Sequence, residues 1–121
     1  MTTDRLRKSC LARPEATEGF PFGPEVSVFK VGGKIFAISS LQSSPLRVSV
    51  KCEPELAEQL RATYAAVAPG HHLNKRHWNT VTLDGTLPDE MVFDMLEDSY
   101  DLVVEGLPRR VRDALGWSPG A

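Results

Sequence analysis

The hydrophobic positions along this 121-residue chain predict three closely spaced β-strands. Residues 26–31 and 34–38 are rich in β-branched and aromatic side chains, and the intervening Gly32-Gly33 pair is typical of a two-residue hairpin turn, which needs positive φ angles. Residues 46–51 alternate apolar and polar side chains, which indicates a strand buried on one face only. The three runs together predict an antiparallel meander.

Apolar residues at helical spacing predict the helices around this meander. The expected helices cover residues 3–13, 54–68, 88–105 and 108–115. Prolines begin three of these segments, as is common in a first helical turn, and glycines or prolines follow their ends. We expect Gly106 to end the long third helix in the left-handed conformation.

Two further segments complete the predicted fold. Residues 78–83 are expected to form a strand, whereas residues 71–77 are compatible with either a loop or a short strand. The Pro- and Gly-rich residues 14–25 predict a loop, which we expect Phe20 and Phe22 to pin to the core. The fold class is therefore α+β, a two-layer sandwich of an antiparallel sheet with helices on one face. The other face must meet water or a partner.

Length and composition are those of one globular domain, expected over residues 1–117 with a frayed tail over 118–121. No segment has the roughly 18 consecutive apolar residues that a membrane span requires, and the first residues lack the apolar stretch of a secretory signal. Two cysteines, Cys10 and Cys52, are too few for a disulfide framework. A single disulfide between them remains an alternative, but reduced thiols in a cytoplasmic protein are the simpler interpretation.

Charge is distributed unevenly around a net value of −2. Residues 84–106 carry eight Asp or Glu and no Lys or Arg, whereas residues 1–52 carry eight basic and four acidic side chains. An acidic run of this kind is usually the solvated face of a helix, and mimicry of DNA phosphates or cation binding is the alternative. We expect these acids to lie on the helical layer, away from the basic residues.

Several residue combinations resemble functional motifs without matching them. Gly32-Gly33-Lys34 lacks the spacing of a phosphate loop and lies between two strands. The Asp98-Ser99-Tyr100 run lies in mid-helix, where a catalytic serine would have neither a base nor an oxyanion site. The three histidines, His71, His72 and His77, do not form a tight metal-binding pair. The sequence thus predicts no catalytic residue, no metal and no cofactor.

The most informative cluster is the run Lys75-Arg76-His77-Trp78. If Val81 faces the core, strand alternation turns Trp78 to the opposite face. By the same alternation, Arg47 and Lys51 lie on the polar face of the 46–51 strand. A tryptophan beside basic side chains can stack on a base while the charges hold phosphates. The alternative is that Trp78 packs over the sheet edge and that the basic residues are merely solvated.

Three stretches together resemble the MmcQ/YjbR family. They are FPFGPEVSVFKVGGKIFAI at 20–38, LNKRHWNTVTL at 73–83 and PDEMVFDMLEDSYDLVVEGLP at 88–108. The resemblance implies an α-β(3)-α-β(2)-α order, here followed by a short C-terminal helix, and places the additional strand within residues 70–75. Members of this family are commonly described as DNA-binding proteins with a double-wing arrangement. The family supplies no established catalytic residue.

These observations lead to one functional expectation and one alternative. We expect a non-enzymatic DNA-binding protein that contacts phosphates through a basic surface formed by Arg47, Lys51, Lys75, Arg76, His77 and Trp78. The alternative is a protein-interaction or chaperone-like module that uses the uncovered sheet face. We expect a monomer or weak homodimer, with DNA as partner, no membrane contact and no small-molecule ligand.

Overall fold

A computed structural model describes residues 1–70 and 73–117, which form four helices and six strands. The helices are α1 (Thr3–Leu11), α2 (Pro54–Thr63), α3 (Asp89–Glu105) and α4 (Arg109–Leu115). The strands are β1 (Thr17–Gly19), β2 (Ser27–Val31), β3 (Lys34–Ser39), β4 (Arg47–Lys51), β5 (Val67–Pro69) and β6 (Trp78–Thr82). The predicted tail at 118–121 lies outside the described residues.

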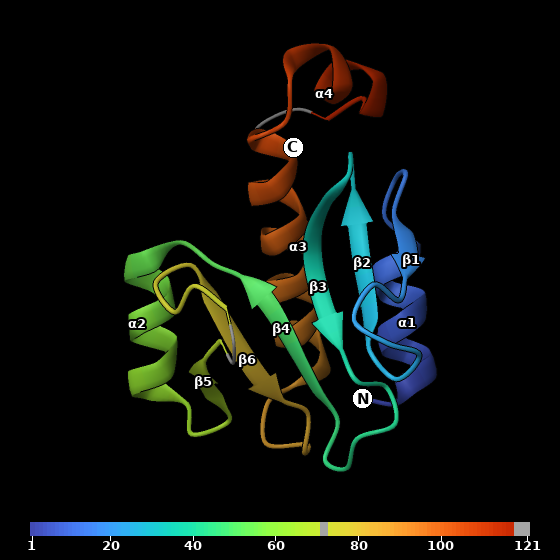
Figure 1. Cartoon of the computed structure of the whole chain (residues 1–121). Coiled ribbons are helices and arrows are strands. Elements are labelled where there is room, and N and C mark those ends of the chain that lie inside the picture. The colour runs from blue at the N-terminus through green and yellow to red at the C-terminus, as the bar shows by residue number, and fades with distance from the viewer. Residues whose placement is uncertain (71–72, 118–121) are drawn as a thin grey trace.

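The six strands form one antiparallel sheet in the order β1-β2-β3-β4-β6-β5. In Figure 1, α1 and α3 lie behind this sheet, and α2 packs beside β5 and β6. The buried Asn79 on β6 donates to the carbonyl of Ala57 on α2, which places α2 on the same side as α3. The predicted two-layer α+β sandwich is therefore confirmed, and the face toward the viewer in Figure 1 is not covered by any described helix.

Apolar side chains of α3 form the centre of the core against the middle strands. Val92, Leu96 and Val104 are almost fully buried, as their helical spacing predicts. The ring of Phe36 meets Tyr100 edge-on at 5.4 Å between centroids, and the Tyr100 hydroxyl donates to the Pro14 carbonyl. Among the described residues, no helix is long and apolar enough to cross a membrane.

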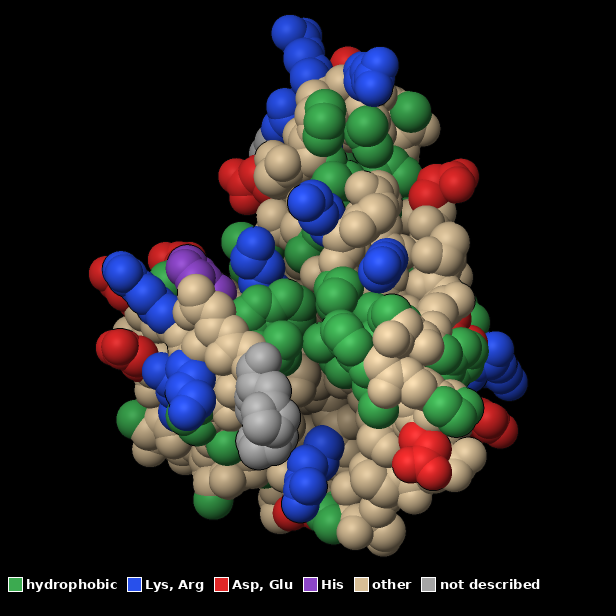
Figure 2. Space-filling model, viewed as in Figure 1, with side chains coloured by type: hydrophobic (Ala, Val, Ile, Leu, Met, Phe, Trp, Pro, Cys, Tyr) green, Lys and Arg blue, Asp and Glu red, His purple; other side chains and the backbone are tan. Residues whose placement is uncertain are grey.

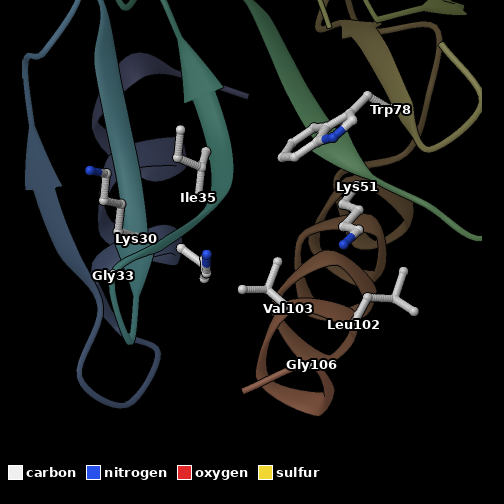
Figure 3. Close-up of a pocket in the computed structure, with 9 residues that line it drawn as sticks. Lys30, Gly33, Ile35, Lys51, Trp78, Leu102, Val103 and Gly106 are labelled. Carbon is white, nitrogen blue, oxygen red and sulfur yellow. The ribbon is translucent and has the colours of Figure 1, made fainter. Parts of the chain in front are cut away.

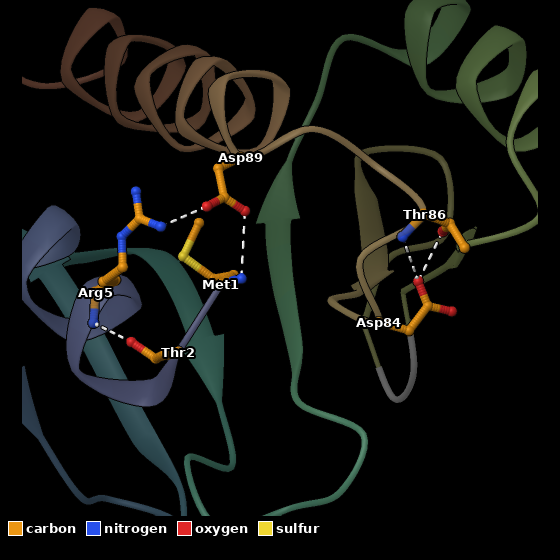
Figure 4. A network of polar contacts seen from close by, with 6 residues as sticks. All are labelled: Met1, Thr2, Arg5, Asp84, Thr86 and Asp89. Carbon is orange, nitrogen blue, oxygen red and sulfur yellow. Dashed lines mark hydrogen bonds and ion pairs between the residues drawn. The ribbon is translucent and has the colours of Figure 1, made fainter.

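The first turns of α1 and α3 are joined by charged groups (Figure 4). The Asp89 carboxylate forms one ion pair with the Met1 ammonium, at 3.3 Å, and another with the Arg5 guanidinium. The hydrogen bond from that ammonium is the main cause that holds the pKa of Asp89 below its usual range. Thr2 caps α1 by accepting from the Arg5 amide at 3.2 Å. The helical layer is thus tied together at its N-terminal end.

Two boundary predictions near α2 were wrong. The helix ends at Thr63, because Tyr64 takes an extended conformation and residues 67–69 form β5. Val67 continues the apolar spacing of the helix, but it pairs with Val81 across the sheet, and strand pairing outweighs local periodicity here. The additional strand therefore precedes the segment 70–75 in which the family resemblance placed it.

Two other local expectations were also wrong. Residues 14–25 contain the short edge strand β1, which pairs with β2 although its composition resembles a loop. Phe20 and Phe22 do not pin the following loop to the core, since 50% and 66% of their surface is exposed. Gly106 ends α3 with a right-handed φ of −82°, whereas Gly116 has the left-handed φ of 68° that ends α4.

The hairpin glycines confirm the predicted turn, with φ of 57° at Gly32 and 79° at Gly33. We expect Gly33→Val to lower the free energy of unfolding by about 1–2 kcal/mol, because a β-branched residue is strained in this region. Gly32→Val should cost more, since a Cβ there would lie 2.6 Å from the Cδ1 of the buried Leu107. Urea denaturation of both variants tests this order, and equal losses would exclude the Leu107 contact as a factor.

Both cysteines are free and buried. Burial raises the pKa of the Cys10 thiol to about 12, and burial is also the main cause that raises the pKa of Cys52. Because the thiolate is the reactive form, we expect neither thiol to react with a disulfide reagent at pH 8 in the native protein. Both should react in urea, as release of the coloured thiol would show. Rapid labelling of Cys10 in the native protein would contradict the packing of α1.

Candidate nucleic-acid interface

The β4–β6 pair places Trp78 and Lys51 side by side on the uncovered face. The register pairs Lys51 with Trp78, Ser49 with Thr80 and Arg47 with Thr82. Asn79 and Val81 alternate with these residues and are buried against the helical layer, as strand alternation predicted. Lys51 and Trp78 are thus neighbours, whereas Arg47 lies at the opposite end of the same strand pair.

Strands β3 and β4 diverge beside Lys51. Within the described chain their ladder joins only Ala37 to Val50 and Ile38 to Ser49. Beyond it, the Ser99 hydroxyl of α3 donates to the Phe36 carbonyl at 2.6 Å and accepts from the Lys51 amide at 2.8 Å. Ser99 therefore satisfies one backbone group on each strand where the direct ladder stops. This explains the buried serine of the Asp98-Ser99-Tyr100 run in structural terms.

A cleft of about 510 Å³ opens where these strands diverge (Figure 3). We call it the lysine cleft, and its walls include Lys30, Lys34, Ile35, Lys51, Trp78 and Val103. No Asp or Glu among the described residues lines it. Within the described part of the chain, the three lysine ammonium groups have no ion pair or hydrogen bond. Three uncompensated lysines therefore line the same cleft as one indole ring.

An irregularity of the β2–β3 pair explains why Lys30 and Ile35 face this cleft. The register passes from Phe29–Ala37 to Lys30–Ile35 and skips Phe36. Phe36 and Ala37 are consequently both buried, and Ile35 is turned to the face that carries Lys30. Sequence reasoning missed Lys30 and Lys34 as site residues, because regular alternation through 34–38 does not reveal a skipped residue.

The floor of the lysine cleft comes from the end of α3. Leu102, Val103 and Gly106 line it, and the first two contribute apolar surface. A helix C-terminus carries about half a negative charge, which is small beside three ammonium groups. The electrostatic balance of the cleft therefore favours anions.

The residues before β6 form a folded turn that carries two further basic side chains. The Asn74 side chain accepts from the Arg76 amide at 2.9 Å, and Arg61 of α2 donates to the Lys75 carbonyl at 2.7 Å. Lys75 and Arg76 are exposed, and His77 is half-buried. The turn thus extends the basic surface from the Trp78 side of the cleft, whereas His71 and His72 lie outside the described residues. The described residues contain no group of three or more His, Cys, Asp or Glu suited to a metal.

Figure 2 shows the resulting surface, with apolar side chains in the middle of the uncovered face, basic side chains around them and acidic side chains toward the outline. Seven of the eight acids of residues 84–106 belong to α3, in the opposite layer. Among them, burial raises the pKa of Asp98, and the nearby Asp101 carboxylate adds to this effect. The expected separation of charge between the two layers therefore holds for α3.

Gly70 fixes the backbone position of Trp78. Its amide donates to the Trp78 carbonyl at 2.9 Å, and a Cβ at Gly70 would lie 2.8 Å from the Cβ of Trp78. We expect Gly70→Ala to lower the free energy of unfolding by about 1–3 kcal/mol through overpacking and to shift Trp78 emission. Gly19→Ala is the matched control, because its Cβ would meet only Pro21, at 4.0 Å. Equal unfolding midpoints for the two variants would contradict this close approach.

The fold and this surface define a class: a two-layer α+β protein with a lysine-lined cleft on an uncovered sheet. The chain belongs to the YjbR family, whose pattern matches residues 11–102. It is 38% identical over 115 residues to YjbR of Escherichia coli K12, covering 95% of this chain and 98% of that protein. It is 40% identical over 108 residues to YbdF of Escherichia coli O157:H7, covering 88% of each chain.

Solved structures agree with this assignment. A crystal structure of a Deinococcus radiodurans protein matches with a TM-score of 0.92 at 43% identity, covering 99% of this chain and 91% of that one. A Pseudomonas syringae protein matches with a TM-score of 0.74 at 24% identity, covering 85% of this chain and 99% of the other, which supports the fold alone. The family resemblance of the three sequence stretches is thereby confirmed.

Proposed function

We propose that this protein is a non-enzymatic DNA-binding protein that contacts phosphates through its uncovered sheet face. The observation that carries the proposal is that Lys30, Lys34 and Lys51 line one cleft with Trp78, with no carboxylate among the described lining residues. A lysine cluster attracts phosphates electrostatically, and a negative net charge does not prevent this when the charges are segregated. Lys75 and Arg76 enlarge the basic surface beyond the cleft.

The proposed binding is modest and largely independent of sequence. Phosphate contacts hold a protein on DNA without reading its bases, and such binding has dissociation constants of roughly 10⁻⁴ to 10⁻⁶ M at physiological salt. The acids of α3 repel DNA from the surface of that helix, which leaves the uncovered sheet face as the proposed contact surface. We further propose that the protein acts in the cytoplasm as a monomer or weak homodimer, without a cofactor.

Fluorescence-anisotropy titration with labelled DNA at two salt concentrations tests this function. We expect binding that weakens steeply as salt increases, because bound lysines release counterions from the phosphates. The slope of log affinity against log salt measures the number of phosphates neutralised. Absence of binding at low salt, or an affinity that does not change with salt, would overturn the proposal.

The alternative function is a protein-interaction module, and exposed aromatic side chains favour it. Phe20 and Phe22 are 50% and 66% exposed in the loop that joins β1 to β2. That loop passes in front of the sheet in Figure 1, on the side that bears the lysine cleft. An apolar protein interface tolerates salt, unlike phosphate binding. Sedimentation at low and high salt distinguishes the two, since salt-independent self-association that Phe22→Ser abolishes would support the alternative.

A further inference from the structure

The lysine cleft has the dimensions of a site for part of a nucleic-acid strand. Its volume of about 510 Å³ falls in the range of roughly 300–1,000 Å³ that is usual for small-ligand pockets. A pocket of this volume has room for about one nucleotide, and a base that is paired and stacked within a duplex cannot enter it. Only an unpaired strand can therefore place a base inside while its phosphates stay at the rim.

The side chains of the lysine cleft provide the three kinds of contact that such a nucleotide requires. Figure 3 shows the Trp78 ring extending from β6 toward the β2–β3 hairpin, with Lys51 beside it and Lys30 on the far wall. Ile35 and Val103 add apolar surface between them. An indole stacks on any base because every base has a π-face, and that face is accessible only in an unpaired strand.

We propose that the lysine cleft binds single-stranded DNA, with a base stacked on Trp78 and the flanking phosphates held by Lys30, Lys34 and Lys51. This inference rests on the proposed DNA-binding function and adds a preference for unpaired strands. The three ammonium groups outweigh the half negative charge of the α3 C-terminus, so an anionic backbone is favoured at the rim. The cleft reads no base sequence, because its described lining residues offer no pair of fixed donors and acceptors for base edges.

The test uses Trp78 as its own probe. The chain has two tryptophans, and a Trp117→Phe background leaves Trp78 as the single emitter. Trp117 donates from Nε1 to Asp101 at 3.0 Å and does not line the cleft. An oligothymidylate of about ten nucleotides, within the site sizes of single-strand binders, is compared with a hairpin duplex of equal phosphate number. We expect quenching of Trp78 and at least tenfold tighter binding of the single strand.

Two variants then separate stacking from packing. Trp78→Phe keeps an aromatic face and should retain most of the affinity for the oligothymidylate. Trp78→Leu keeps apolar bulk but has no π-face, and we expect it to bind roughly 5- to 150-fold more weakly with little change in the salt slope. Thermal melting of each variant checks that both are folded. Equal affinities of the Phe and Leu variants would overturn the stacking contact.

The outcomes also separate this inference from the proposed function. If the hairpin duplex binds as tightly as the single strand, with a steep salt slope and unchanged Trp78 emission, the protein binds DNA but the cleft is not a single-strand site. If neither DNA binds at low salt, both proposals fall together. Tighter, salt-dependent binding of the single strand with quenched Trp78 emission supports both.

Discussion

Reversing the charge of Lys30 and Lys51 together should weaken DNA binding by roughly 30-fold at physiological salt, because each neutralised phosphate contributes about 0.9 to the slope of log affinity against log salt. Both side chains line the lysine cleft without a partner among the described residues. Fluorescence anisotropy at several salt concentrations measures both quantities. We expect the slope to flatten by about 2, as for the loss of two phosphate contacts.

A matched control separates the position of a charge from net charge alone. Lys8→Glu alters the total charge by the same amount as Lys51→Glu, but Lys8 is exposed on α1, in the helical layer. We expect Lys51→Glu to weaken binding severalfold more than Lys8→Glu at the same salt concentration. Equal effects of the two single variants would mean that DNA responds to the overall charge of the molecule, and the lysine cleft would no longer be the site.

Ser99→Ala should lower the free energy of unfolding by about 2–4 kcal/mol, because two buried backbone groups lose their hydrogen-bond partner at once. The Phe36 carbonyl and the Lys51 amide both bond to the Ser99 hydroxyl, which is completely buried. Urea denaturation with linear extrapolation measures the loss. Hydrogen exchange at the Lys51 amide gives an independent signal, since that amide should exchange faster in the variant.

Ser43→Ala provides the comparison for this effect. The Ser43 hydroxyl also donates to a backbone carbonyl, that of Ser40 at 2.8 Å, but it lies in the partly exposed turn before β4. Water can replace a hydrogen bond there, so we expect a loss of no more than about 1 kcal/mol. Similar losses for Ser43→Ala and Ser99→Ala would show that the Ser99 bridge contributes no more than an ordinary surface hydrogen bond.

The contrast between β6 and β3 shows which part of the candidate site was accessible to sequence reasoning. Trp78, Asn79 and Val81 alternate without interruption, so the face of Trp78 could be predicted and the structure agrees. In β3 the register skips Phe36, and this single residue turns Ile35 toward Lys30 on the cleft side. The skip arises in the pairing of β3 with β2 across the Gly32-Gly33 turn, and the skipped Phe36 packs against Tyr100, which lies far from β3 in sequence.

Local sequence patterns also failed to predict the exposure of Phe20 and the early end of α2. Phe side chains are usually buried, but Phe20 lies in the loop after β1, which passes in front of the sheet and leaves half of the Phe20 surface exposed. Val67 has helical spacing relative to Leu60, yet it belongs to β5 because β6 offers a partner for its backbone groups. At Val67, local pattern and long-range pairing compete, and pairing decides.

By itself the sequence determined the fold class, the positive-φ hairpin turn at Gly32-Gly33 and the acidic outer surface of α3, because each depends on local periodicity or backbone freedom. Only the tertiary structure decided that Lys30, Lys34 and Lys51 line one cleft with Trp78. The cleft opens where β3 and β4 diverge around the Ser99 hydroxyl, which lies on α3, 48 residues from Lys51 and 63 residues from Phe36 in sequence. Contacts over such separations are set by the packing of whole layers, and no local pattern encodes them.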